Sequence, residues 1–174
     1  TQDHGLDKAL DNQLIDLCTN ALKSKLPVEI RLPISNANRT VGTTLSSRVA
    51  SRYGEEGLPE DTVQIRFEGS AGQSFGAFLA KGINIHLSGD TNDYMGKGMS
   101  GGRLVVCPDP NSRFVPEENI IIGNVAMYGA TGGQAFIRAR GDNDICASKG
   151  DLLEIGMSTW PGENGQTRAQ FGID

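Results

Sequence analysis

The sequence lacks the features that mark several large classes of protein. It has no run of about 18 apolar residues, the length that a membrane-spanning helix needs. Its first residues, TQDHGLDKAL, do not have the pattern of a secretory signal peptide. Positive charge is also short, since 16 Lys and Arg stand against 21 Asp and Glu, and the net charge of −5 gives no general attraction to nucleic acid or anionic lipid. We therefore expect a cytoplasmic protein with no nucleic acid and no membrane among its partners.

Cysteine is scarce as well. The three cysteines, Cys18, Cys107 and Cys146, fit neither a disulfide framework nor the paired ligands of a zinc or iron–sulfur site. Free thiols in a reducing compartment are the expectation. With 174 residues the chain is long enough to bury a core without disulfides or metal ions. It begins at Thr1 rather than at methionine, which suggests a trimmed chain or a piece of a longer one.

Glycine, by contrast, is abundant: 23 of 174 residues, or about 13 %, against a usual share of about 7 %. Much of it falls in an internal repeat, because residues 63–82 align without a gap on residues 83–102 at an offset of 20. The matching positions are Gly69 with Gly89, Gly76 with Gly96, Gly82 with Gly102, Ile65 with Ile85, Phe67 with Leu87, and Phe75 with Met95. A repeat of this length is typical of solenoid folds.

A third copy follows after an insertion. ENIIIG, residues 118–123, repeats the strand-then-glycine unit, and GATGG, residues 129–133, repeats GMSGG, residues 98–102. The segment before it, CPDPNSRFVPEE at residues 107–118, has three prolines and several charges. We interpret this segment as an excursion from the repeat.

The repeat predicts the fold class. Val63, Ile65 and Phe67 alternate with polar residues, which is typical of a strand with one buried face. A strand and a glycine turn that return every 20 residues favour a chain whose equivalent strands stack in parallel. The expected fold is mainly β, a single-stranded parallel β-helix with coils of about 20 residues, preceded by two short helices and a strand.

The N-terminal part is expected to cover one end of this β-helix. Apolar spacing predicts helices over residues 6–22 and 41–53, with a strand over 28–32 between them. We expect one compact domain overall. Its segments are a helix–strand–helix cover at 1–58, the β-helix at 59–150, and a tail at 151–174 that is placed to cap the last coil.

Residues 96–101 spell G-x-G-x-x-G with Lys97 in the second place, a pattern of phosphate-binding loops. A dinucleotide site needs a helix after the glycines, whereas the strand-like RLVVC follows here. A Walker loop needs Ser or Thr after the lysine, and Gly98 stands there. We therefore interpret the glycines as turns that need a positive φ or a close backbone approach. The predicted turn glycines are Gly69, Gly76, Gly82, Gly89, Gly96, Gly98, Gly101, Gly102, Gly123, Gly129, Gly132 and Gly133.

The acidic residues and histidines do not indicate a catalytic or metal site. Asp90, Asp93 and Asp109 suggest calcium, but the G-G-x-G-x-D repeat of calcium-binding β-rolls is missing, so solvated turn carboxylates are favoured. His86 is predicted on the outward face of its strand, and the other histidine is His4. The period of 20 does not match the six-residue period of hexapeptide acyltransferases, which use a catalytic histidine.

Candidate nucleophiles and cations give the same result. Ser74, Ser100 and Cys107 have no partner pattern close in sequence that would mark an activated nucleophile, although partners distant in sequence stay open. Lys97 and Arg103 have the charge to bind an anion, but basic residues beside aspartates more often form a solvated surface. The residues expected to fill the core here are Met95 and Met99.

Longer segments of the chain resemble a known family. The segments at residues 34–54, 58–82, 89–106 and 124–141 closely resemble the C-terminal G-x-G-x-G domain of the glutamate synthase large subunit. They include NANRTVG, GSAGQSFGAF and YGATGGQAFIRARG, and the resemblance extends over residues 5–150. A glycine-repeat module of formylmethanofuran dehydrogenase is a more distant cousin, which shares the glycine repeats but not the NANRTVG segment.

The resemblance implies a right-handed parallel β-helix with no catalytic residue, no cofactor and no metal of its own. It implies that this domain braces the glutaminase and synthase domains of an enzyme that makes glutamate from glutamine and 2-oxoglutarate. Those partner domains hold the N-terminal cysteine nucleophile, the FMN and the 3Fe-4S cluster. After residue 150 the family continues into another glycine-rich coil, whereas this chain continues with DLLEIGMSTWPGENGQTRAQFGID.

Three other functions stay open at this point. A small ligand-binding or catalytic protein would use residues 96–102, where a lysine lies within a glycine loop. A free-standing β-helix would self-associate into a homo-oligomer through an uncovered end coil. A module similar to that of formylmethanofuran dehydrogenase is the third.

Overall fold

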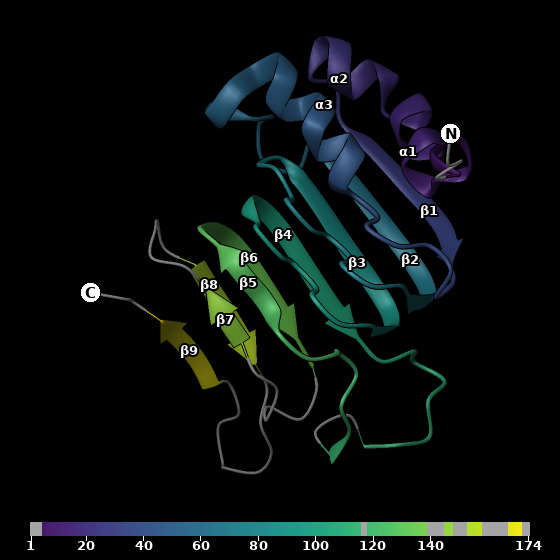
Figure 1. Cartoon of the computed structure of the whole chain (residues 1–174), viewed down its shortest axis with the longest axis vertical. Helices are drawn as coiled ribbons and strands as arrows, with labels where there is room; N and C mark the ends of the chain where they lie inside the picture. The colour runs from purple at the N-terminus through teal and green to yellow at the C-terminus, as the bar shows by residue number, and fades with distance from the viewer. Residues whose placement is uncertain (1–4, 116–117, 139–144, 148–152, 158–166, 172–174) are drawn as a thin grey trace.

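The computed structural model describes residues 5–115, 118–138, 145–147, 153–157 and 167–171. Its helices gather at one end of a stack of strands, and the N-terminus lies at that end (Figure 1). The helices are η1 (Leu6–Lys8), α1 (Leu10–Leu17), α2 (Thr19–Ser24), α3 (Thr43–Tyr53) and η2 (Gly54–Glu56). The strands are β1 (Val28–Ile34), β2 (Val63–Ala71), β3 (Ile83–Thr91), β4 (Ser100–Cys107), β5 (Ala126–Ala130), β6 (Gly132–Ile137), β7 (Ile145–Ala147), β8 (Leu153–Met157) and β9 (Thr167–Phe171).

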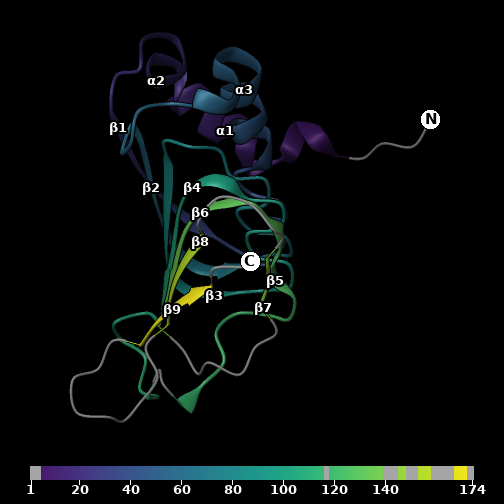
Figure 2. The same cartoon turned by 90° about the vertical axis from the view of Figure 1, so that its left-hand side faces the viewer.

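The strands form a long, mostly parallel sheet. Its order is β1-β2-β3-β4-β6-β8-β9, and only the last pair, β8 with β9, is antiparallel. A second sheet pairs β5 with β7, and it lies on the opposite side of the molecule from the long sheet (Figure 2). No helix within the described ranges is long and apolar enough to cross a membrane.

The internal repeat is confirmed by the register of β2 and β3. Ile65 pairs with Ile85, and Gly69 pairs with Gly89, as the offset of 20 predicts. The next pair of strands differs, because Leu104 of β4 pairs with Ile85 at an offset of 19. One residue is therefore dropped between β3 and β4, and this changes which face each residue of β4 occupies.

The predicted strand at residues 28–32 is β1, and it belongs to the long sheet. It pairs in parallel with β2 along its whole length, from Val28 opposite Val63 to Ile34 opposite Gly69. After β1, the backbone N–H of Gly76 donates to the carbonyl of Val41. The N-terminal part thus adds a strand and a turn to the stack, with α3 inserted after the turn.

The predicted helix over residues 6–22 is broken into pieces. Ala9 is extended between η1 and α1, and α1 ends before Cys18. The Thr19 hydroxyl donates to the Asp16 carbonyl at 2.8 Å, so it competes with the helical hydrogen bonds at this point. The helix predicted over residues 41–53 is α3, which starts two residues later and ends at Tyr53, where it is followed by Gly54 with φ of 60°.

A buried carboxylate fixes α1 against the start of α3. Asp11 is only 3 % exposed. One of its oxygens accepts the backbone N–H of Gly42 at 2.7 Å, and the other accepts those of Thr44 at 2.5 Å and Leu45 at 3.2 Å. These N–H groups have no partner within α3, so Asp11 caps that helix from a distance in sequence. Burial raises the pKa of Asp11, and the backbone donors offset part of this effect.

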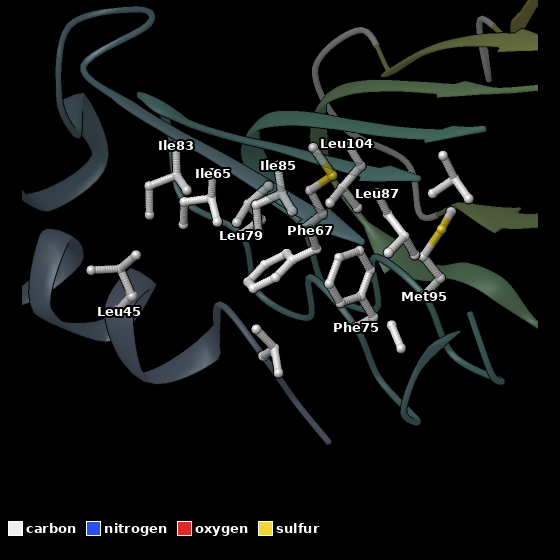
Figure 3. Close-up of a cluster of buried hydrophobic side chains, with 14 of the residues drawn as sticks. Leu45, Ile65, Phe67, Phe75, Leu79, Ile83, Ile85, Leu87, Met95 and Leu104 are labelled. Atoms are coloured by element: carbon white, nitrogen blue, oxygen red, sulfur yellow. The ribbon is translucent and has the colours of Figure 1, made fainter. Parts of the chain in front are cut away.

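The core lies between the long sheet and the turns opposite it. Ile65, Ile83 and Ile85 of the strands gather with Phe67 and Phe75, as Figure 3 shows. The two phenylalanine rings meet edge to face, with centroids 5.9 Å apart. Met95 and Met99 are fully buried, as predicted for core-filling residues.

The predicted third copy starts differently from the first two. The segment ENIIIG has no strand in its described part, residues 118–123, and only Ile122 forms an isolated parallel bridge, to Thr91. The reason is that β4 already supplies the strand beside β3. After the excursion the chain returns beside the end of β3, where Ile122 bridges to Thr91.

Candidate functional site

The glycine turns stack on one another opposite the long sheet. The N–H of Gly96 donates to the carbonyl of Phe75 at 2.8 Å, and the N–H of Met127 donates to that of Met95 at 2.7 Å. Gly76, Gly96 and Met127 therefore occupy equivalent places, with φ of 67°, 65° and 60°. Each turn is built on the backbone of the one before it, in the manner of a strand ladder.

Most of the predicted turn glycines have a backbone that favours glycine. Positive φ occurs at Gly69, Gly76, Gly82, Gly89, Gly96, Gly98, Gly102, Gly129 and Gly133. The other three lie close to neighbouring backbone, because a Cβ on Gly101 would lie 2.8 Å from the Lys81 nitrogen, and Gly123 and Gly132 meet Asp93 and Ser100. The sheet gives a second reason for glycine, since a Cβ on Gly89 would overlap the Gly69 carbonyl oxygen.

The loop with the phosphate-binding pattern has no backbone donors left for a ligand at residues 96–101. All six N–H groups donate to backbone carbonyls, and those of Gly96, Gly98 and Ser100 bond neighbouring coils through Phe75, Tyr128 and Leu79. Lys97 extends over the ring of Tyr94, with Nζ 5.4 Å from the centroid. A phosphate loop needs free N–H groups that point at the anion, so this loop is a structural turn.

The three aspartates do not form one cluster, although Asp90 and Asp109 line the same cavity. Asp90 accepts the Ser70 hydroxyl at 2.6 Å, Asp93 accepts the Asn124 N–H at 2.9 Å, and Asp109 accepts the Asn111 N–H at 2.7 Å. Across the described residues, no group of three or more His, Cys, Asp or Glu side chains is placed to hold a metal ion. These carboxylates serve local turns and neighbouring coils.

The serines and Arg103 are also held locally. The Ser74 N–H donates to the Asp93 carbonyl in the stacked turns, and Ser100 starts β4. Arg103 donates from Nε to the Gln134 side chain at 2.8 Å and lies 3.5 Å from Asp61. None of these contacts pairs a serine hydroxyl with a base.

The outward face of the long sheet brings together two residues that the sequence did not pair. Cys107 Sγ of β4 lies 3.2 Å from His86 Nε2 of β3. Arg66 of β2 lies behind the imidazole, with one guanidinium nitrogen 3.5 Å from Nδ1, and Glu29 of β1 accepts from Arg66 at 3.2 Å. Burial, and secondarily the charge of Arg66, lower the pKa of His86. The sequence would have predicted this pair only if the register of β4 against β3 had been known. The offset of 20 in the repeat does not give that register, because β4 pairs at an offset of 19.

A groove lies beside the excursion, where β2 and β3 end. Two adjoining cavities of about 390 and 430 Å³ share the lining residues Ser70, Asp90, Ile120 and Ile121. Ile120 is 59 % exposed, and Phe114 and Val115 of the same excursion are 42 % and 47 % exposed. This part of the surface, which we call the excursion groove, combines exposed apolar side chains with carboxylates.

Comparison with known proteins places the chain among glutamate synthase sequences. It is 56 % identical over 136 residues to "Glutamate synthase [NADH]" of Schizosaccharomyces pombe. The matched segment covers 78 % of this chain and 6 % of that protein. It is 48 % identical over 140 residues to "Glutamate synthase [NADPH] large chain" of Bacillus subtilis. This match covers 80 % of this chain and 9 % of that protein. A ferredoxin-dependent glutamate synthase of Pyropia yezoensis is 47 % identical to this chain over 122 residues. The match covers 70 % of this chain and 8 % of that protein.

This chain thus spans less than a tenth of the length of these relatives. The resemblance recognised in the sequence is confirmed by these matches. A family model described as "GXGXG motif" matches residues 11–149, which include the stacked strands β1 to β6 and their turns. The chain therefore belongs to the GXGXG motif family.

Proposed function

We propose that this chain is a non-catalytic scaffold domain of glutamate synthase type. It braces a glutaminase part against a synthase part in an enzyme that makes glutamate from glutamine and 2-oxoglutarate. The observation that carries the proposal is the match of 78 % of the chain to 6 % of a protein named as a glutamate synthase. We propose that a segment forming so small a part of the enzyme contributes through its contacts with the remainder.

The stacked turns support a structural role for the glycines. In a loop that binds phosphate the N–H groups point at the ligand, whereas residues 96–101 direct theirs to backbone carbonyls. We propose that the stacked units form a right-handed β-helix, whose rigidity comes from these ladders and from the shared core. A rigid body of this kind suits a brace between larger domains.

We propose that FMN and the 3Fe-4S cluster belong to the partner domains. Three cysteine thiolates would be needed for such a cluster, and the described residues contain no metal-binding group of that size. An FMN phosphate would need donors like those that residues 96–101 use within the stack. Both observations support the proposal that neither group is held by residues 96–101 or by a cysteine cluster among the described residues. A cytoplasmic location is part of the same proposal.

The excursion groove is the surface that we propose for docking against the rest of the enzyme. Its exposed apolar residues, Phe114, Val115 and Ile120, lie within seven residues of one another in the chain. Each would bury apolar area on contact, at roughly 25 cal/mol per Å². Self-association through the free edge of β1 is less favoured, because Glu29, Arg31 and Pro33 of that strand disfavour pairing with another strand.

A segment exchange tests the proposal. In the large chain of Bacillus subtilis, which is 48 % identical over 140 residues, the matching segment is replaced by that of this chain. The chimera is expected to retain glutamine-dependent glutamate formation. Introducing Phe114→Asp and Ile120→Asp together should lower that activity, because two buried carboxylates would oppose docking.

Leu17→Asp is the matched control for this experiment, because Leu17 is 47 % exposed and belongs to α1, which lies at the helical end of the stack, away from the excursion (Figure 1). It should leave the activity unchanged. An inactive chimera that still folds and binds flavin would contradict the scaffold proposal. Equal activity of the groove variant and the Leu17 variant would leave the scaffold role standing and remove the excursion groove as the docking surface.

A further inference from the structure

The outward face of the long sheet carries a thiol–imidazole pair that the scaffold role does not use. Cys107 is the register partner of Ser88, which is two residues beyond His86 on β3, so Cys107 and His86 lie on the same face. Their Sγ and Nε2 atoms are 3.2 Å apart, and both residues are partly exposed. A thiol and an imidazole at this distance form a hydrogen bond whose direction depends on which ring nitrogen carries the proton.

The neighbours of His86 decide which nitrogen carries its proton. Arg66 can only donate, so Nδ1 of His86 accepts from it across 3.5 Å. In the neutral ring the proton then lies on Nε2, the atom that faces the sulfur of Cys107. Burial and Arg66 lower the pKa of His86, which keeps the ring neutral near pH 7. The imidazole therefore directs an N–H donor toward the sulfur of Cys107, and the thiol in turn donates to the Leu87 carbonyl at 3.8 Å.

Cys18 provides the contrast within the same chain. It is completely buried, and burial raises its pKa to about 11. The thiolate is the reactive form of cysteine. Cys18 is therefore unreactive for two reasons, because reagents cannot reach its sulfur and because little of it is ionised. The side chain of Cys146 lies outside the described residues.

A cavity is lined by two neighbours of Cys107, although Cys107 itself is not among its lining residues. Pro108 follows Cys107 in the chain, Ser88 pairs with it in the sheet, and both line the cavity of about 430 Å³ at the excursion groove. This volume is within the range that holds a small organic molecule.

We propose that Cys107, oriented by His86, is a site of thiol–disulfide exchange with a low-molecular-weight disulfide. The Cys107 thiol loses its proton to water, and the thiolate attacks one sulfur of the reagent. A new S–S bond forms to Cys107 as the S–S bond of the reagent breaks, and the second half leaves as a thiolate. The reagent is the oxidant, since one of its sulfurs is reduced as Cys107 is oxidised. This inference is independent of the proposed function.

The test measures the rate of exchange with 4,4′-dithiodipyridine, a neutral disulfide whose released half absorbs light. Peptide mapping assigns the label to individual cysteines. Cys107 is expected to react fastest and Cys18 to stay unlabelled until the chain unfolds, which makes Cys18 the internal measure of folding. His86→Ala should slow the reaction of Cys107 roughly tenfold, the effect of one hydrogen bond to a charged sulfur.

Two further variants separate orientation from shielding. His86→Gln keeps a neutral N–H donor and should restore part of the rate, whereas Arg66→Gln removes the contact that fixes the tautomer and should slow the reaction less than His86→Ala. If the imidazole only covers the thiol, His86→Ala will speed the reaction, because the smaller side chain opens access. A rate in His86→Ala equal to or above that of the native chain, with Cys18 still protected, overturns the proposal.

Discussion

The stacked glycines lead to a graded prediction for alanine substitutions. Gly5, Gly96 and Gly89 have positive φ of 61°, 65° and 150°, but they differ in what a new methyl group would meet. At Gly5 it would meet no atom within 4 Å. At Gly96 it would meet the side chain of Met127, and at Gly89 it would overlap the carbonyl oxygen of Gly69. The three sites therefore separate backbone conformation from steric contact.

The expected losses of unfolding free energy follow from these contacts. Gly5→Ala should cost about 1 kcal/mol, the usual penalty for a left-handed conformation with a side chain. Gly96→Ala should cost about 1 to 2 kcal/mol, because the flexible Met127 side chain can move away. Gly89→Ala should cost about 4 kcal/mol, since the strain adds to the loss of about two ladder hydrogen bonds as β2 and β3 move apart.

Thermal unfolding followed by circular dichroism measures this series. For a domain of this size each kcal/mol lowers Tm by roughly 2 to 4 °C, so Gly89→Ala should melt about 8 to 16 °C below the native chain and Gly5→Ala only about 2 to 4 °C below it. Equal Tm values for the Gly89 and Gly5 variants would refute the reasoning. That result would mean that the strands do not approach closely enough at this position for the missing Cβ to matter.

Further predictions concern Asp11 and Lys97. Asp11→Ala leaves two buried backbone N–H groups and one partly buried one without their acceptor, so urea unfolding should show a loss of about 3 kcal/mol. A loss below about 0.5 kcal/mol would remove Asp11 as the cap. Because burial raises the pKa of Asp11 above its ordinary value of 3.8, the folded chain holds this proton more tightly than the unfolded chain. Relative to Asp11→Asn, the stability of the native chain should be highest below pH 3.8 and fall as pH rises through the raised pKa, and a flat difference would contradict this sign. Lys97→Ala should lower Tm by no more than about 4 °C through loss of its contact with Tyr94, and roughly 10 mM phosphate should shift neither protein, whereas stabilisation of the native chain alone would revive the phosphate loop.

Several parts of the fold could be predicted because two copies of the repeat, residues 63–82 and 83–102, follow each other in the sequence without a gap. The alternation of Val63, Ile65 and Phe67 identifies the buried face of β2, and the offset of 20 places β3 beside it. Periodicity identified α3 in the same way, and Gly54 marked its end. These signals are local, and they are strong because each buried residue has an apolar counterpart one coil away.

The place of β1 was harder to predict, although its sequence carries a signal. VEIRL at residues 28–32 matches VQIRF at residues 63–67, and the two strands pair at that offset of 35. The insertion of α3 lengthens the first coil and hides the repeat from any search at an offset of 20. Asp11 was missed for a related reason, because nothing near it in sequence indicates that its partners are the first N–H groups of α3.

The chemistry of the outward face depends on a single residue of register. At an offset of 20, Cys107 would stand opposite Leu87, which is fully buried, and its sulfur would belong to the core. At the observed offset of 19 it stands opposite Ser88, on the same face as His86. The residue is dropped near the glycines before Arg103, where the ladder from β4 to β6 is also irregular. Glycine tolerates either spacing there, so packing between coils selects the register. Leu104 and Val106 are both buried at the offset of 19, and their burial brings Cys107 beside an imidazole.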